Sequence, residues 1–332
     1  MAHTELMPLL QIAQQSFGAV QRSGALAVLP LYGPDTNGKF AGPLSGLKLA
    51  GVKGYGNVEL ENPRGSSGIS IVPLHIGYIQ DRAQNHAMCR SAFLAPGQKL
   101  LFQDACCVQQ SQGGYLQGAE QWFFILPLAL REEALSLRRV QSYGKLWPAI
   151  ARLNVDLGLP ERGHLEQIVC RQRPYLTQYA SRFELLKGQT GALFFLGQRL
   201  VGMEIAPSPR YFAEVWMPLV CFCYGVAAMQ LERNSPAAHS APAEPFAARN
   251  LEDLRHELAE SRRRAQDALM ESLRAMPRET FALDEEERFL DLSLKTLTGK
   301  SFVGQTVDDG GRLVYASIFA RKDFLTSPMA AV

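Results

Sequence analysis

The stretch TGALFFLGQRLVGMEI, residues 190–205, carries two short apolar runs on either side of a Gly-Gln pair at 197–198. A two-residue connection that begins with glycine is typical of a β-hairpin, because glycine readily adopts the positive φ that such turns need. The Ser-Pro pair at 208–209 is a strong helix start, since serine caps free backbone N–H groups and proline has none to lose. The sequence therefore predicts a hairpin followed by a helix that runs to about Glu232 and bends near Pro218.

The chain before this hairpin shows two different patterns of apolar residues. Residues 25–130 hold short apolar runs separated by glycine and proline, which indicates an antiparallel sheet. Apolar residues at helical spacing then predict helices over 132–140, 143–157 and 164–186, and another over 4–17 at the start of the chain. The fold class that follows is α+β, with an antiparallel sheet flanked by helices.

The chain after this helix begins with a stretch rich in proline and alanine. We predict an α+β domain over residues 1–233, a linker over 234–248, and an extension of one long helix plus a β-hairpin over 249–332. A hairpin is marginally stable alone, so the extension is expected to dock on the main sheet. The apolar stripe of the helix at 250–276 could instead meet a protein partner.

Composition limits the function classes. The 332 residues carry a net charge of +2, which argues against nucleic-acid binding through bulk charge. The N-terminus has no secretory pattern and no run of eighteen apolar residues occurs, so we expect a cytoplasmic protein without a membrane span. Six cysteines without metal-ligand spacing are expected to be reduced and mostly buried, and neither a metal nor a cofactor is predicted. Common nucleotide-loop and hydrolase motifs are absent, and His164-Leu-Glu166 lacks the downstream cysteine pair of a zinc deaminase.

One polar segment stands out between two predicted strands. It contains Asp81, Arg82, Gln84, Asn85 and His86 within six positions. Arg82 could hold a phosphate or carboxylate, and the two amides could fix an amide or hydroxyl group, so the segment is a candidate ligand site. A solvated hairpin turn remains the alternative explanation.

Motifs within and after this segment resemble those of the ARPP-1 family, which is named for its association with ADP-ribosylglycohydrolases and rhodanese/phosphatase-like proteins. Residues 84–86 correspond to the family's Q-N-R, 107–109 to its C-V-E and 113–115 to its G-R-W, and the hairpin and helix from Gly191 to Tyr224 complete a resemblance over about 25–232. The resemblance adds Gln109 and Tyr115 to the candidate ligand-binding residues. It also exposes a departure: His86, Gln109 and Tyr115 stand where the family has arginine, glutamate and tryptophan, so the motif carboxylate is missing.

Three functional hypotheses remain open. The first is a ligand-binding or adaptor protein that acts beside systems handling ADP-ribose or related nucleotides. The second is a hydrolase or transferase on a nucleotide-derived substrate, with Asp81 or His86 as acid/base and Asp104 as a further nearby acid. The third is a subunit of a larger assembly. The missing motif acid favours the first hypothesis.

Overall fold

The computed structural model describes residues 4–5, 15–36, 38–79, 84–111, 122–234, 246–276 and 278–326. Its largest element is a ten-stranded antiparallel sheet in the order β1-β17-β18-β19-β20-β16-β15-β4-β2, with β3 also paired to β4. The strands are β1 (Thr4–Glu5), β2 (Ser16–Phe17), β3 (Gln21–Ser23), β4 (Leu26–Tyr32), β15 (Gly191–Leu196), β16 (Arg199–Ile205), β17 (Thr280–Phe289), β18 (Leu292–Thr298), β19 (Phe302–Asp309) and β20 (Arg312–Ala320). The α+β fold class is thus confirmed.

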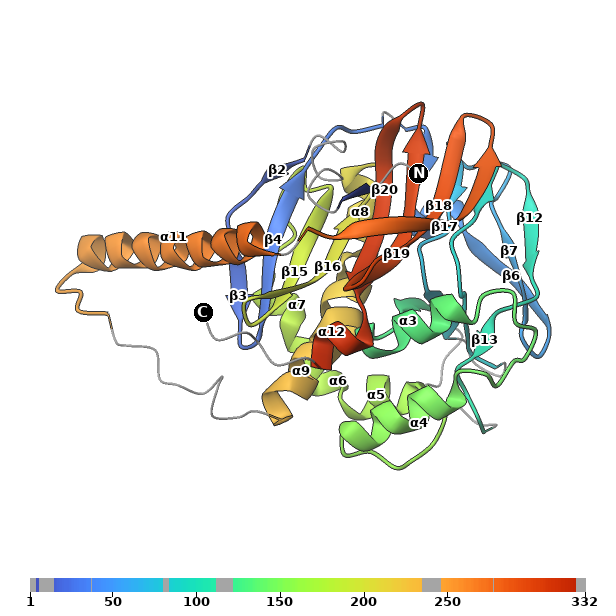
Figure 1. Ribbon diagram of the computed structural model, residues 1–332, viewed down its shortest axis with the longest axis horizontal. Coiled ribbons are helices and arrows are strands. Elements are labelled where there is room, and N and C mark those ends of the chain that lie inside the picture. The colour runs from blue at the N-terminus through green and yellow to red at the C-terminus, as the bar shows by residue number, and fades with distance from the viewer. Residues whose placement is uncertain are drawn as a thin grey trace.

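The predicted hairpin forms the middle of this sheet. β15 pairs with both β16 and β4, and Gly197 has a φ of 64° in the turn. β16 pairs in turn with β20, so the C-terminal strands are built into the same sheet as the N-terminal ones (Figure 1). The expected docking of the C-terminal extension is confirmed. The extension holds two hairpins, β17–β18 and β19–β20, and β18 pairs with β19 to join them.

Three smaller sheets lie beside the main sheet, in the orders β13-β10-β9-β14, β11-β8-β5 and β12-β7-β6. Their strands are β5 (Phe40–Ala41), β6 (Lys48–Gly54), β7 (Asn57–Glu61), β8 (Ile69–Ile71), β9 (Ile76–Ile79), β10 (His86–Ala87), β11 (Phe93–Leu94), β12 (Lys99–Phe102), β13 (Cys106–Cys107) and β14 (Trp122–Ile125). The polar candidate segment enters the first of these sheets at β10.

The helices cover these sheets. They are α2 (Pro43–Gly46), α3 (Leu128–Ser136), α4 (Trp147–Asp156), α5 (Glu166–Arg171), α6 (Arg173–Leu176), α7 (Gln178–Arg182), α8 (Pro209–Met217), η1 (Pro218–Tyr224), α9 (Gly225–Asn234), α11 (Leu251–Ala275) and α12 (Lys322–Thr326). One expectation was wrong. The single helix over 164–186 is broken into α5, α6 and α7, with Pro174 in the first turn of α6, where a residue without an N–H is tolerated. Of the helix expected over 4–17, the described residues Thr4–Glu5 and Ser16–Phe17 form β1 and β2, paired with β17 and β4, and the rest lies outside the described residues.

The helix after the hairpin runs through the core. Ser208 caps it by accepting a hydrogen bond from the Tyr211 N–H at 3.1 Å, as predicted. At Pro218 the helix widens from α to π geometry, which is where the bend was expected. Residues 209–234 are long and apolar enough to cross a membrane, but 78% of the most apolar window is buried within the protein. That burial is typical of a core helix.

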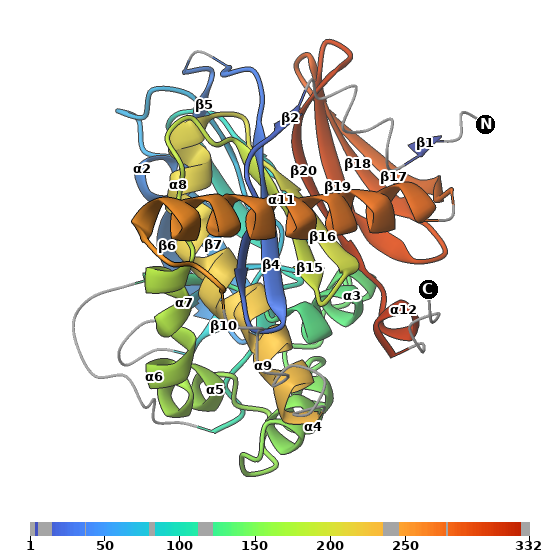
Figure 2. The ribbon, with the colours of Figure 1, turned by 90° about the vertical axis from the view of Figure 1, so that its left-hand side faces the viewer.

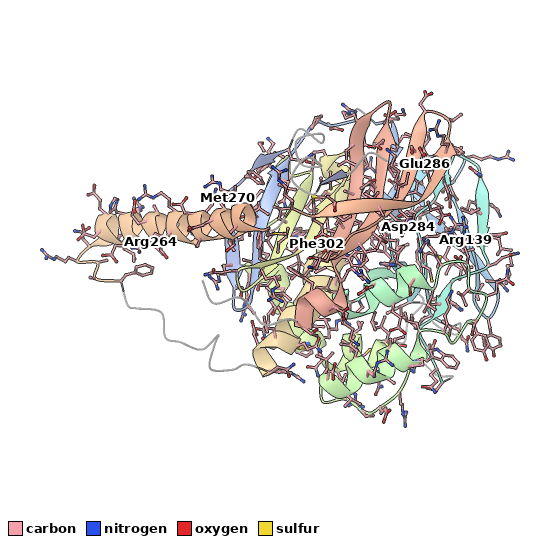
Figure 3. All side chains as sticks on the ribbon, viewed as in Figure 1. Arg139, Arg264, Met270, Asp284, Glu286 and Phe302 are labelled. Atoms are coloured by element: carbon pink, nitrogen blue, oxygen red, sulfur yellow. The ribbon has the colours of Figure 1, made fainter. Side chains whose placement is uncertain are left out.

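The long helix α11 crosses the outer side of β4, β15 and β16 (Figure 2). Leu269 and Leu273 near its C-terminal end are buried, whereas Leu251 at its N-terminal end is 74% exposed. Figure 3 shows the same contrast, with Met270 where the helix reaches the sheet and Arg264 on the part that projects from it. The C-terminal half of the apolar stripe therefore packs on its own sheet, and a partner for the N-terminal half stays a prediction.

Candidate functional site

The described part of the polar segment is built into the core. Asn85 and His86 are each only 2% exposed, and His86 pairs with Cys107 across β10 and β13. The main chain of Asn85 accepts a hydrogen bond from the Val108 N–H at 2.9 Å and donates one to Gln109 Oε1 at 3.1 Å. Two of the resembling motifs, 84–86 and 107–109, are thus neighbours in space.

His86 is held in one neutral form by the main chain. Its Nδ1 donates to the Gln84 carbonyl at 2.9 Å, and its Nε2 accepts from the Gly56 N–H at 3.2 Å. Burial lowers the pKa of His86, although the hydrogen bond to Gln84 acts in the opposite direction. Both ring nitrogens are therefore engaged in structural hydrogen bonds. Its role in acid/base chemistry or ligand binding stays a prediction.

A buried carboxylate lies against Asn85, and sequence reasoning missed it. Glu166, 2% exposed, accepts a hydrogen bond from Asn85 Nδ2 at 3.2 Å. It reaches this position because residues 163–165 lie alongside residues 108–110: the Leu165 N–H donates to the Val108 carbonyl at 2.9 Å, and Gln109 forms a β-bridge with His164. A buried carboxylate from more than fifty positions later in the chain thus lies next to the Asn85–Gln109 pair.

His164 connects Glu166 to the surface. The imidazole is 1% exposed, its Nε2 lies 3.4 Å from Glu166 Oε2, and its Nδ1 lies 3.2 Å from the Oγ of Ser111. Because an ionised carboxylate only accepts hydrogen bonds, this order favours a proton on Nε2 and an unprotonated Nδ1 facing the serine. Ser111 is exposed, so a hydroxyl, an imidazole and a carboxylate form a continuous chain from solvent into the core. We call Ser111, His164 and Glu166 the serine relay.

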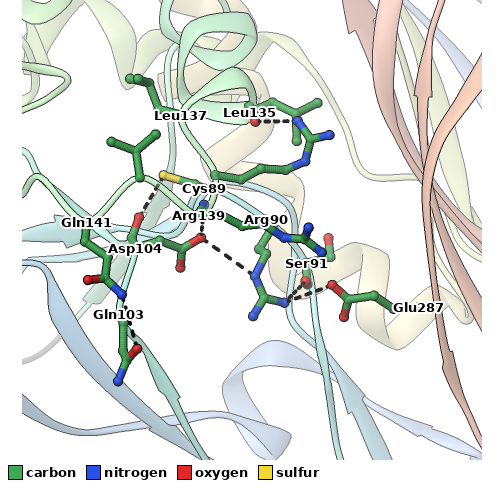
Figure 4. A network of polar contacts seen from close by, with 12 residues as sticks. Cys89, Arg90, Ser91, Gln103, Asp104, Leu135, Leu137, Arg139, Gln141 and Glu287 are labelled. Carbon is green, nitrogen blue, oxygen red and sulfur yellow. Dashed lines mark hydrogen bonds and ion pairs between the residues drawn. The ribbon is translucent and has the colours of Figure 1, made fainter.

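Asp104, the further acid, serves a different network. Its Oδ2 accepts from the Arg139 N–H at 2.8 Å and lies 3.8 Å from Arg90 Nε, while Arg90 also pairs with Glu287 of β17 at 3.5 Å (Figure 4). These contacts tie the small sheets to the C-terminal strands. Asp104 is therefore held in place by structural partners.

The remaining predicted residues lie outside the serine relay or outside the described residues. Gln84 is half-buried, and its Oε1 lies 3.5 Å from the Cys107 thiol. Asp81, Arg82 and Tyr115 belong to segments outside the described residues, as does most of the predicted linker. Within the described ranges, no three His, Cys, Asp or Glu side chains lie close enough together to hold a metal ion.

A second buried polar cluster centres on Arg131, which is fully buried. Its guanidinium donates to Glu204 Oε1 at 2.6 Å, Ser317 Oγ at 2.5 Å and His75 Nδ1 at 3.2 Å. Burial acts to lower the pKa of Arg131, but the charges of Glu204, Cys223 and Tyr224 and the hydrogen bond to Glu204 together outweigh it and raise that pKa. His75 is completely buried, and burial together with the charge of Arg131 holds its pKa well below the usual value. This cluster joins α3 to β16 and β20 and supports the fold.

The sequence was compared with known families, curated proteins and solved structures. The model of a family described as "ARG and Rhodanese-Phosphatase-superfamily-associated Protein domain" matches residues 14–319. The chain belongs to the ARPP-1 family. The ARPP-1 match extends beyond the resemblance seen over 25–232 and includes β17 to β19 and nearly all of β20, in agreement with the single sheet that these strands share with β4. No curated protein and no solved structure gives a significant match.

Proposed function

We propose that this ARPP-1 chain is a hydrolase or acyl-transfer enzyme with Ser111 as nucleophile, His164 as general base and Glu166 as the acid that orients the base. The observation that carries the proposal is the unbroken hydrogen-bonded order of hydroxyl, imidazole and buried carboxylate in the serine relay. A nucleophile, a base within hydrogen-bond reach and a third group that orients the base are the recurring elements of nucleophilic catalysis.

The proposed reaction uses each member for a distinct step. Ser111 Oγ attacks an acyl carbonyl carbon while its proton passes to His164 Nδ1, and the carboxylate of Glu166 stabilises the resulting imidazolium. The proton then passes to the leaving group as the acyl bond to it breaks. Water, or a second acceptor in a transferase, then attacks the acyl-serine with His164 again as base. The bond between the acyl carbon and Ser111 Oγ breaks, and the proton returns from His164 to Ser111 Oγ. Because His164 and Glu166 are buried, their charge pairing acts at low dielectric constant, where it is stronger than in water.

Asn85 and Gln109 are assigned supporting roles in this proposal. Asn85 holds Glu166, and Gln109 holds the main chain of Asn85. Both residues were candidates for ligand contacts, and their burial favours a role in shaping the site. Gln84, together with Arg82 and Tyr115, remains a proposed ligand-binding residue. The proposed substrate class is nucleotide-derived, and its support is the association recorded in the family's name.

The serine relay can be tested with a fluorophosphonate probe, which labels serine hydroxyls activated by a base. We expect labelling at Ser111 in the wild-type protein, no labelling in Ser111→Ala, and a fall of about 10²-fold or more in the labelling rate for His164→Gln and Glu166→Gln. Ser142→Ala is the matched control, because Ser142 is also exposed but its hydroxyl makes no hydrogen bond to a histidine among the described residues. Equal labelling rates in the wild type and His164→Gln would refute the proposal, provided the variant melts at the wild-type temperature.

Ligand binding is tested separately from catalysis. A ligand that binds only the native state raises the melting temperature by mass action. We expect ADP-ribose, NAD or a related nucleotide to raise the melting temperature of Ser111→Ala, which retains the site without the nucleophile. If no nucleotide does so while the probe still labels wild-type Ser111, the substrate class is wrong and the serine relay stands.

A further inference from the structure

Two buried thiols lie in contact beside the site. Cys89 and Cys106 are both completely shielded from solvent, and their Sγ atoms are 3.2 Å apart. Cys106 lies opposite Ala87 in the β10–β13 pair, so Cys89 reaches it diagonally across the ladder. Its neighbour Cys107 points elsewhere, with its Sγ 3.3 Å from the Gln109 carbonyl, as expected for adjacent residues on a strand.

The surroundings make one thiol more reactive than the other. Lys145 inserts its ammonium group among main-chain carbonyls and donates to those of Asp104, Leu137 and Val140 at 2.6–2.8 Å. The hydrogen bond with Cys106 lowers the pKa of Cys89, burial opposes this, and the charge of Lys145 lowers it further. The pKa of Cys106 is raised, chiefly by the same hydrogen bond with Cys89. Cys89 is therefore the thiol suited to attack an oxidant, and Cys106 is the thiol suited to attack the oxidised Cys89.

We propose that Cys89 and Cys106 form a reversible disulfide when the protein meets a hydroperoxide. The other cysteines offer no equivalent pair: Cys221 and Cys223 lie on one helical segment, and all six cysteines are free in the structure. A disulfide needs the two sulfurs at about 2.05 Å, so they have little more than 1 Å to close. Because β10 and β13 are already hydrogen-bonded, the closure needs only local movement.

The chemistry balances as a two-electron oxidation. The Cys89 thiolate attacks one peroxide oxygen, an S–O bond forms, the O–O bond breaks, and the departing oxygen takes up a proton to leave as water or an alcohol. The sulfur of Cys106 gives up its proton and attacks the Cys89 sulfenic acid. The S–S bond forms, the S–O bond breaks, and water leaves with that proton. Two thiols are oxidised and one peroxide is reduced.

This crosslink would fix the strand that carries the candidate site. Cys106 immediately precedes Cys107, which pairs with His86, and Gln109 and Ser111 follow in the same strand and its continuation. A bond from Cys106 to Cys89 would therefore pin one edge of the site to the chain that follows β10. The inference does not depend on the proposed enzymatic function, because it rests on the thiols alone.

The test uses the full-length reduced protein and hydrogen peroxide. After treatment, free thiols are alkylated in denaturant, and the intact mass and tryptic peptides are measured. Arg90 and Lys99 separate the two cysteines, so the crosslink joins two peptides. We expect the oxidised protein to carry four alkyl adducts where the reduced protein carries six, and a reducing agent to restore all six.

Matched variants identify the pair. Cys107→Ser retains the crosslink, whereas Cys106→Ser and Cys89→Ser lose it, although Cys106 and Cys107 are adjacent and equally buried. The wild-type peptide map carries the test even if a variant fails to fold. Oxidation confined to Cys170, the one cysteine that is only partly buried, would overturn the proposal. So would a disulfide between any other pair, or conversion of Cys89 to an acid that Cys106 does not resolve.

Discussion

The buried cluster around Arg131 allows the most quantitative prediction. Replacing Arg131 by Met keeps the apolar length of the side chain and removes the charge. Glu204, only 6% exposed, then retains the Tyr224 hydroxyl at 2.7 Å but loses its charged partner, and Ser317 and His75 lose their donor. Leaving one charge of a buried pair uncompensated costs about 3–5 kcal/mol. With an unfolding entropy of about 2.1 cal/mol/K per residue, the melting temperature should fall by roughly 4–7 °C.

A double-mutant cycle separates the orphaned charge from lost packing. Glu204→Leu combined with Arg131→Met removes both charges, so the double variant should be more stable than the sum of the single effects predicts, by about 2 kcal/mol or more. Urea denaturation of the four proteins measures this coupling. Arg152→Met is the control: Arg152 pairs with Glu133 at 3.1 Å, but the side chains are 56% and 38% exposed, so the loss should stay below about 1 kcal/mol.

Two outcomes would refute this reasoning. If Arg131→Met costs less than about 1 kcal/mol, solvent or structural relaxation compensates Glu204, and the cluster does not behave as a buried pair. If the effects of the two substitutions are simply additive, the charges do not interact across the 2.6 Å contact, contrary to the structure.

Further predictions concern acid stability, capping and packing. Burial lowers the pKa of both His75 and His86, so each is neutral when folded and binds a proton on unfolding below about pH 6.5. The free energy of unfolding should therefore fall below that pH, by up to about 1.4 kcal/mol per histidine per pH unit. A lower urea midpoint at about pH 5.5 than at about pH 7.5 would confirm it. Asn250 accepts from the first backbone N–H groups of α11, at 2.9 Å each, so Asn250→Ala should cost about 1 kcal/mol of local helix stability, visible as faster amide exchange in the first turn and absent from the sheet. Gly202→Ala should destabilise the protein strongly, because a Cβ there would lie 2.0 Å from the Tyr224 hydroxyl; an unchanged melting temperature would contradict the close packing of η1 on β16.

Part of the candidate site could be predicted from the sequence. The density of polar groups around Asn85 indicated that this segment needs polar partners, and Asn85 does contact the buried Glu166. The association of the segment with Gln109 came from the family resemblance, and the hydrogen bond between them is present. The residue types did not reveal that Asn85 and His86 face inward. The Asn85 side chain hydrogen-bonds to Glu166, and the His86 ring hydrogen-bonds to the main chain of Gln84 and Gly56.

The serine relay could not be found in the same way. Ser111, His164 and Glu166 come from two segments some fifty residues apart, and no spacing rule connects them. His164-Leu-Glu166 lacks the downstream cysteine pair of a zinc deaminase, so the sequence alone assigns it no chemistry. A signal did exist, because a histidine and a glutamate close together at a predicted helix start need polar partners if they are buried. Only the β-bridge between Gln109 and His164 shows which segment lies beside them.

The sequence by itself determined the local elements: the hairpin around Gly197, the capped start at Ser208, the helix beginning at Asn250, and the ARPP-1 motifs. These depend on interactions within a few residues, which a linear pattern records directly. Only the tertiary structure decided that β20 joins β16, that Glu166 lies against Asn85, and that Cys89 meets Cys106. Such contacts depend on which apolar faces of the strands and helices are buried together, and on whether each buried polar group has a hydrogen-bond partner. Both are properties of the folded chain as a whole.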